Sequence, residues 1–112
     1  MTVEEFFVEY LSSALDVPVS GDIPDPKPKR FVTLELTGSR SENFLYHPII
    51  AVQAWADNRA DAGRLNEAVK TAMAKAVELP RISRCRLNGD YYFPELELKI
   101  PRYQSTYEVT YL

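Results

Sequence analysis

The segment from Pro48 to Leu79 constrains the fold most, because an apolar strand pattern runs into the one long amphipathic helix pattern with almost no loop between them. Seven of the eight residues in 49–56 are apolar, which is typical of a central strand covered on at least one face. Asp57 is the expected N-cap of the helix, and Pro80 marks its end. The predicted buried stripe consists of Ala62, Leu65, Val69, Ala72, Met73 and Ala76. Strand and helix must therefore pack closely together.

A shorter helix is predicted at the amino terminus. Thr2 and Glu5 have the spacing of a capping box, in which each satisfies a free amide of the other. A helix this short needs to dock against the sheet to be stable. The side chains expected to make that contact are Phe6, Phe7, Tyr10, Leu11, Ala14 and Leu15.

The segment 17–30 contains four prolines within eleven residues, which excludes a helix and favours extended backbone. We expect a short edge strand at 17–19. Clean alternation then predicts a strand over 31–37, which forms an antiparallel hairpin with 44–50. Residues 38–43 are the expected polar turn of this hairpin, and His47–Pro48 is expected to interrupt its return strand.

After the long helix, alternation predicts a strand over 82–87, and Asn88–Gly89 has the composition of a type I′ hairpin turn. Residues 95–100 are expected to form an excursion or a short edge strand, and 102–112 the last strand. Together these patterns predict a single α+β domain, 1–112, with a four- to five-stranded, mainly antiparallel sheet and two helices packed on one face. Trp55 alternates with its apolar neighbours and is expected to point away from the helices.

Composition and charge argue against several classes of function. The net charge of −3 gives no electrostatic case for nucleic-acid binding, and the cluster Arg81, Arg84 and Arg86 is interpreted as solvated charge. The single cysteine, Cys85, excludes an intrachain disulfide and is interpreted as a small buried apolar group, in preference to a nucleophile with His47 as its base. We expect a cytoplasmic protein, because no apolar run is long enough to cross a bilayer and the amino terminus is acidic.

Catalytic signatures are absent from the sequence. It contains no glycine-rich phosphate loop, no HExxH, CxxC or GxSxG motif, and no recognisable pair of carboxylates. We therefore expect no enzymatic activity, no cofactor and no metal.

The order of these elements extends over nearly the whole chain. It consists of the amino-terminal helix, Val17-Pro18-Val19 with the proline-rich segment, Phe31-Val32-Thr33-Leu34, Ile49 to Ala56 followed by the helix from Arg59 to Ala76, Tyr92-Phe93-Pro94, and Pro101-Arg102-Tyr103-Gln104 with an alternating final strand. In this order the chain resembles the tail terminator, or tail-completion, proteins of long-tailed bacteriophages.

The resemblance implies a structural virion protein that assembles as a homohexameric ring on the head-proximal end of the tail. Such a ring stops polymerisation of the major tail tube protein and contacts the head–tail connector. The particle is assembled in the host cytoplasm. The expected tube-contacting loop consists of Gly38, Ser39, Arg40, Ser41, Glu42 and Asn43. The expected subunit interface consists of Tyr91, Tyr92, Phe93, Arg102 and Tyr103. Two alternatives stay open: a head-completion or neck protein of the same particle, and a non-phage α+β binding module such as a toxin–antitoxin partner.

Overall fold

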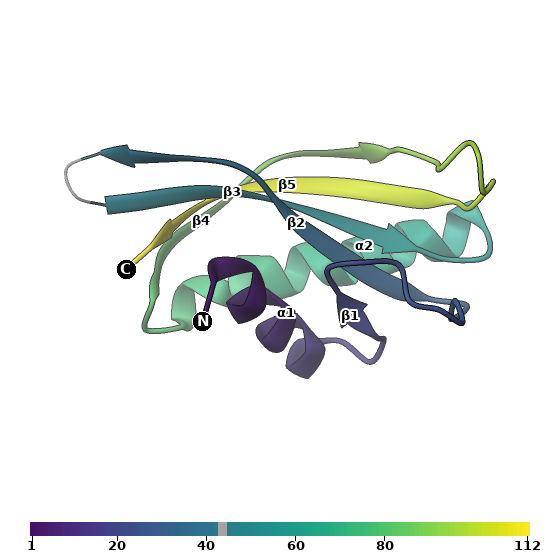
Figure 1. The fold of residues 1–112 in the computed structure, drawn as a ribbon, viewed down its shortest axis with the longest axis horizontal. Coiled ribbons are helices and arrows are strands. Elements are labelled where there is room, and N and C mark those ends of the chain that lie inside the picture. Colours follow the sequence, from purple (N-terminus) through teal and green to yellow (C-terminus); the bar gives the residue numbers. More distant parts are fainter. Residues whose placement is uncertain (43–44) are drawn as a thin grey trace.

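One mixed sheet, mostly antiparallel, organises the chain (Figure 1). The computed structural model describes residues 1–42 and 45–112. In these residues the strands are β1 (Val19–Ser20), β2 (Phe31–Glu42), β3 (Leu45–Trp55), β4 (Ile82–Tyr92) and β5 (Arg102–Tyr111), and the sheet order is β1-β2-β3-β5-β4. Only β1 pairs in parallel, with β2. The predicted α+β class and strand number are confirmed.

The two α-helices begin as their capping residues dictate. The helix α1 (Val3–Ala14) has the predicted capping box, in which Thr2 Oγ1 accepts from the Glu5 amide at 3.1 Å. The helix α2 (Arg59–Ala74), which continues as the 3₁₀ helix η1 (Lys75–Glu78), is capped by Asn58. Asn58 Oδ1 accepts from the Asp61 amide at 2.8 Å. The predicted cap at Asp57 is therefore wrong, because the helix begins at Arg59 and the residue before it, Asn58, has the extended backbone and the side-chain acceptor of an N-cap.

The β2–β3 hairpin is longer than predicted. The expected loop over 38–43 belongs to β2 as far as Glu42, and Arg40 lies opposite His47. A bulge between Leu36 and Gly38 shifts the register of the pairing with β3, and the strand continues beyond it. The expected interruption at His47–Pro48 is also wrong, since β3 runs through both residues. Its pairing with β5 skips them, so the missing proline amide breaks no bond of that ladder.

The predicted turn at Asn88–Gly89 is wrong as well. Both residues lie within β4, where a bulge separates Leu87 from Gly89 in the pairing with β5. A type I′ turn needs positive φ, and no glycine of the described chain has it. The chain reverses instead over the expected excursion, where Glu95 and Ile100 form an isolated bridge.

Two clusters of buried side chains divide the core. The larger contains residues of α1, α2, η1 and all strands from β2 to β5, including Phe7, Leu11, Val69, Met73 and Tyr107. The smaller contains Phe31, Trp55 and Ile100 and lies apart from it. Trp55 thus belongs to a different cluster from the helices, as its alternation predicts.

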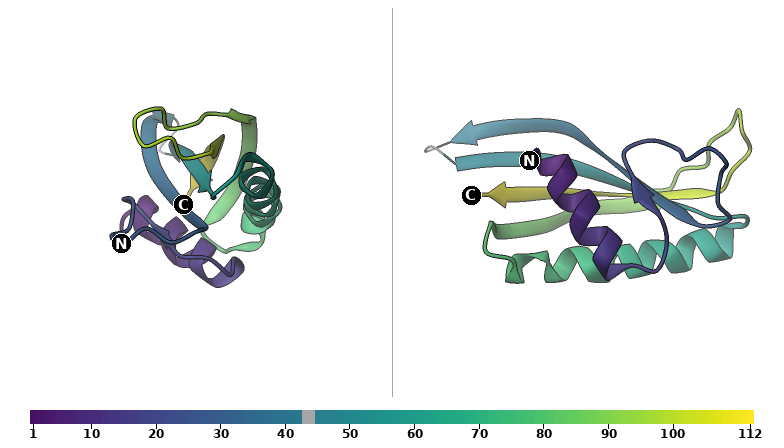
Figure 2. Two further views of the ribbon diagram at one scale, coloured as in Figure 1. Left: turned by 90° about the vertical axis from the view of Figure 1, so that its right-hand side faces the viewer. Right: turned by 60° about the horizontal axis from the view of Figure 1, so that its bottom comes forward.

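The molecule is elongated, with principal extents of 43 × 24 × 23 Å. Figures 1 and 2 show that both chain ends lie toward one end of the long axis. The connection between β4 and β5 lies toward the opposite end.

Candidate interaction surfaces

The five residues expected at a subunit interface are brought together where β4 ends and β5 begins. Tyr92 and Tyr103 are cross-strand partners whose ring centroids lie 5.2 Å apart. The Phe93 amide donates to the Arg102 carbonyl at 2.8 Å, and Arg102 Nε donates back to the Phe93 carbonyl at 2.6 Å. Tyr91 completes the group through a ring contact with Phe93 at 5.6 Å. The five residues therefore lie together, and their place at a subunit interface stays a prediction.

The cluster is divided between the two faces of the sheet. Tyr92 and Tyr103 lie on the side of α2, where the Arg59 guanidinium is 4.2 Å from the Tyr92 ring centroid. Arg59 Nε also donates to the Tyr103 hydroxyl at 3.4 Å. Both tyrosines therefore already contact the Arg59 side chain of α2. Tyr91, Phe93 and Arg102 belong to the opposite side, called here the Trp55 face.

A ladder of stacked side chains crosses the Trp55 face from β2 to the end of β4. Phe31 stacks on Trp55 with ring centroids 5.3 Å apart and planes 11° apart. Arg102 follows, with its guanidinium carbon 4.7 Å from the Trp55 ring and 4.3 Å from the Phe93 ring. A guanidinium between two aromatic faces gains cation–π attraction on both sides. Strand alternation identified Trp55, but the sequence holds no signal that Arg102 would lie against it.

A chain of polar side chains runs beside this ladder. Trp55 Nε1 donates to Thr33 Oγ1 at 2.9 Å, and Thr33 donates to Gln53 Oε1 at 2.8 Å. Gln53 Nε2 donates to Gln104 Oε1 at 2.7 Å, and Gln104 donates to the Tyr91 hydroxyl at 2.6 Å. Buried polar groups need partners of this kind. The chain joins β2, β3, β5 and β4 and was not predicted.

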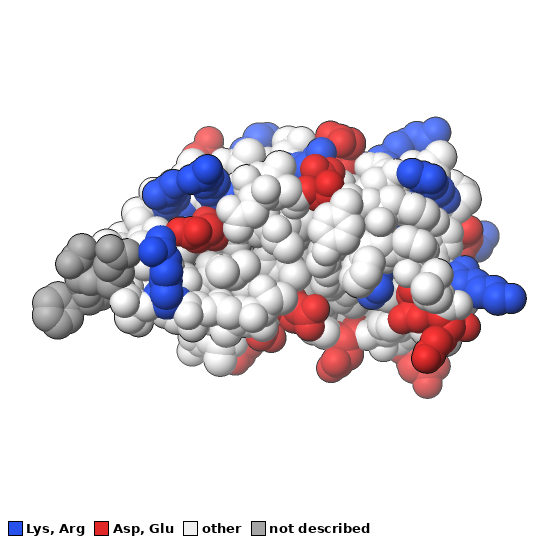
Figure 3. All heavy atoms as spheres, turned by 90° about the horizontal axis from the view of Figure 1, so that it is seen from above, with Lys and Arg blue, Asp and Glu red and all other residues white. Residues whose placement is uncertain are grey.

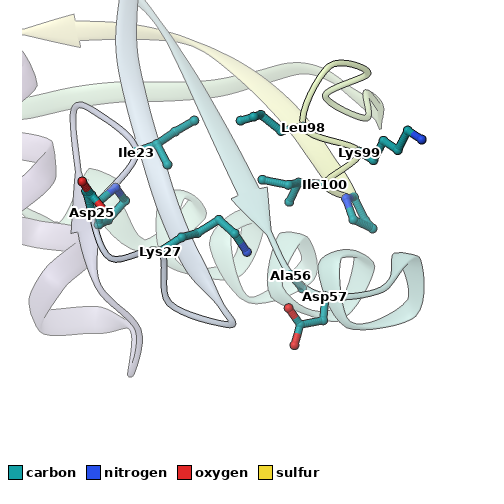
Figure 4. A pocket seen from close by; sticks show the side chains of 10 residues that line it. Ile23, Asp25, Lys27, Ala56, Asp57, Leu98, Lys99 and Ile100 are labelled. Carbon is teal, nitrogen blue, oxygen red and sulfur yellow. The ribbon is translucent and has the colours of Figure 1, made fainter.

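The connection between β4 and β5, called here the 94–101 loop, exposes two leucines. The exposed fractions are 79% for Leu96 and 57% for Leu98. A cavity of about 640 Å³ separates this loop from the proline-rich segment. In Figure 4, Ile23 and Leu98 point toward one another from the two segments, whereas Lys99 points away. An exposed apolar surface of this kind is typical of an interaction site.

The residues expected to contact the tube lie on the hairpin at the other end of the molecule. Gly38 to Glu42 are strand residues there, and Asn43 lies outside the described residues. Arg40 Nη2 contacts Glu108 Oε1 at 2.8 Å. The Arg40 hydrogen bond lowers the pKa of Glu108, and the charges of Arg40, Arg84 and His47 add to the effect. Figure 3 shows Lys and Arg side chains gathered near the grey residues, around an acidic group.

Cys85 and His47, considered in the sequence as a nucleophile and its base, do not lie together. Cys85 packs against the larger core cluster, and burial raises the pKa of its thiol to about 11. His47 Nδ1 instead contacts the Thr110 hydroxyl at 3.0 Å. Because Cys85 pairs with Val109, the neighbour of Thr110, the two side chains lie on opposite faces of β5. Cys85 is half-buried, so its expected burial as a small apolar group holds only in part.

The described residues contain no group of three or more histidine, cysteine, aspartate or glutamate side chains arranged to hold a metal ion. No helix among them is long and apolar enough to cross a membrane.

Comparison with known proteins assigns no family. No protein-family model matches the chain, and no curated protein is similar enough to count as a match.

Proposed function

We propose that this chain is a structural virion protein that caps the head-proximal end of a phage tail tube as a ring. The observation that carries the proposal is the concentration of exposed aromatic and aliphatic side chains around the end of β4. Tyr91, Phe93, Leu96 and Leu98 lie within eight residues and are each more than 40% exposed. Such a patch favours protein–protein contact, and aromatic residues with a nearby arginine are enriched in interfaces.

The arrangement of layers supports this proposal. We infer that both helices pack on one face of the sheet, because the side chains that they bury join one cluster with the sheet, and Figure 1 draws both helices on the same side. The centre of the Trp55 face is covered, because Phe31 and Trp55 are buried with Ile100 of the 94–101 loop, and Tyr91 and Phe93 at its edge stay exposed for partners. Its stacked ladder and polar chain hold that surface rigid, which lowers the entropy cost of binding.

In this proposal the partners are five further copies of the chain, the major tail tube protein and the head–tail connector. Tyr91, Phe93 and Arg102 contribute to the contact between subunits, together with the edges of Tyr92 and Tyr103. The tip of the β2–β3 hairpin, including Gly38 to Glu42, meets the tube. The protein acts without enzymatic activity, a cofactor or a metal, and resides in the virion after assembly in the host cytoplasm.

Two other functions compete with this one. A head-completion or neck protein of the same particle would use the same kind of rigid surface against a different partner. A non-phage binding module would use it to hold one partner and would remain a monomer or dimer.

Electron microscopy of the purified protein mixed with its polymerising tube protein tests the proposal. We expect shortened tubes that carry a six-fold ring on one end. The Phe93→Ser variant should lose the ring, whereas Val77→Ser, which changes an exposed apolar residue on η1, should keep it. Unchanged tubes without added density would favour the neck position or a module outside the virion.

A further inference from the structure

The Asn88–Gly89 motif of β4 has no part in the proposed function. It is the one place in the sequence where an asparagine precedes a glycine. The motif does not form the predicted turn and lies in a strand at the edge of the sheet. The pairing with β5 passes directly from Leu87 to Gly89, so Asn88 is the extra residue of a bulge. Asn88 therefore lies outside the pairing that holds its neighbours.

The side chain of Asn88 is free to move. It is exposed and makes no hydrogen bond within the part of the chain that the structure describes. The other described asparagines are held in place. Asn58 caps α2 and also donates to Asp61, whereas Asn66 is buried and donates to Asp90. Asn88 thus differs from both in the freedom of its amide group.

Gly89 leaves the main-chain nitrogen after Asn88 unshielded. No heavy atom beyond its two chain neighbours lies within 4 Å of the position that a Cβ on Gly89 would take. Its φ is not positive, so the backbone conformation itself does not require glycine. What glycine provides here is close approach, because no side chain stands between the Asn88 amide carbon and the next nitrogen.

We infer that Asn88 is a site of deamidation through a succinimide. The Gly89 nitrogen gives up its proton to hydroxide and attacks Cγ of Asn88, so that a new C–N bond closes a five-membered ring. The side-chain NH₂ takes up a proton and leaves as ammonia. Water then adds to one of the two ring carbonyls and breaks its bond to nitrogen. The product at position 88 is aspartate or isoaspartate, and the reaction consumes only water.

Ring closure requires a local opening of the strand. The main chain at Asn88 has to leave the extended conformation for Cγ to approach the next nitrogen, and Gly89 is paired with Thr106. An edge strand opens more easily than one paired on both sides, and a bulge already departs from the regular ladder. We therefore expect the reaction to proceed in the folded protein, at a rate that the opening of this edge limits.

The product changes the edge of β4 in two ways. Both aspartate and isoaspartate add a negative charge, and isoaspartate also lengthens the main chain by a methylene group. The added length lies shortly before Tyr91, whose hydroxyl accepts from Gln104 at 2.6 Å. We expect the isoaspartate form to weaken this hydrogen bond, because it shifts the end of β4 relative to β5.

Peptide mapping by mass spectrometry tests the inference. The full-length folded protein is incubated at mildly alkaline pH and sampled over time. We expect the peptide that contains Asn88 to gain the mass difference between a carboxyl and an amide, while peptides with Asn58 and Asn66 stay unchanged. Chromatography should separate an aspartate form from an isoaspartate form. Isoaspartate is diagnostic of the ring, since direct hydrolysis of the side-chain amide yields aspartate alone.

Gly89→Ala is the matched variant, because the structure leaves room for its methyl group. We expect it to react at Asn88 about tenfold more slowly or less, a change that needs only ~1.4 kcal/mol of steric cost in the transition state. Circular dichroism checks that the variant is folded. A sample unfolded in guanidinium chloride gives the rate without structure.

Three results would overturn the inference. The first is conversion at Asn88 no faster than at Asn58, over a time in which the unfolded sample converts. The second is aspartate without isoaspartate, and the third is an equal rate in Gly89→Ala. None of these measurements involves tail tubes or self-association, so their outcome is independent of the proposed function.

Discussion

Arg102, the first residue of β5, joins the stacked rings of Phe31 and Trp55 to the ring of Phe93. Its guanidinium contacts the rings of Trp55 and Phe93, and its Nε donates to the Phe93 carbonyl. Arginine suits this place better than lysine, because a planar guanidinium can stack and donate a hydrogen bond at the same time. The residue therefore stabilises the surface that the proposed ring uses.

We expect Arg102→Ala to lower the free energy of unfolding by about 1–2 kcal/mol, through the loss of cation–π attraction and a hydrogen bond. The emission of Trp55, the one tryptophan in the sequence, should shift to the red as its ring becomes wetter. Urea denaturation followed by fluorescence measures both effects. Arg64→Ala removes an exposed arginine whose partner Asp61 lies one helical turn away, and should change stability far less. Equal losses in the two variants would contradict this role.

Glu108 provides a prediction about pH. Its pKa is lowered from the ordinary value of 4.5, chiefly by the hydrogen bond from Arg40. The carboxylate therefore contributes stability above pH 4.5, and this contribution is lost as the pH falls through the lowered pKa. In Arg40→Ala, the pKa of Glu108 should rise toward 4.5, as measured by NMR titration of the side-chain carboxyl carbon. Arg64→Ala serves as the control, and an unchanged pKa in Arg40→Ala would refute the assignment.

Lys99 has a φ of 55°, which places a residue with a side chain in the left-handed region. This conformation costs an L-amino acid about 1–2 kcal/mol, whereas glycine adopts it freely. Lys99→Gly should therefore raise the free energy of unfolding by about 0.5–1 kcal/mol, after the entropy cost of glycine is subtracted. Denaturation of Lys99→Gly beside Lys99→Ala measures the effect. A Gly variant no more stable than the Ala variant would show that the strain is not stored there.

At the scale of elements, the capping box fixes where α1 begins. Thr2→Ala should cost about 1 kcal/mol, since the Glu5 amide then loses its acceptor. Thermal unfolding measures the loss, and Thr2→Ser, which keeps the hydroxyl, should restore most of it. If serine and alanine destabilise the chain equally, the hydroxyl has no capping role.

Some sequence signals are sufficient to predict a helix or a strand, and others are not. The capping box at Thr2 and the stripe from Phe7 to Leu11 are local, so they predicted α1 well. The signals at Gly38 and Asn88–Gly89 failed because a bulge lets a strand continue through residues that also favour turns. Whether the chain turns there depends on the partner strand, which alternation alone does not reveal.

Local patterns predict one part of the candidate interfaces, and the other part depends on pairing between distant strands. Tyr91, Tyr92, Phe93, Arg102 and Tyr103 could be grouped because they flank one reversal of the chain. Their division between two faces, and the ladder from Phe31 to Phe93, depend on register across four strands. The buried cluster of Phe31, Trp55 and Ile100 joins residues far apart in the sequence, so no local pattern could have predicted it.

At the scale of the whole molecule, β3 should form the most stable part. It pairs on both sides, with β2 and β5, and its residues 50–55 are buried. Native-state hydrogen exchange should give the amides of 50–55 the highest protection, while residues 21–30 and 95–99 exchange fastest. NMR detection resolves these segments. Protection in 95–99 equal to that in β3 would contradict this order.

The two bulges of β4 have a consequence for the behaviour of concentrated protein. They lie on a sheet edge that also carries the exposed side chains of Arg84 and Arg86. Bulges and charges make an edge a poor template for a further strand, and so protect the chain against amyloid-like growth. The chain can thus reach high concentration without edge-to-edge pairing through β4.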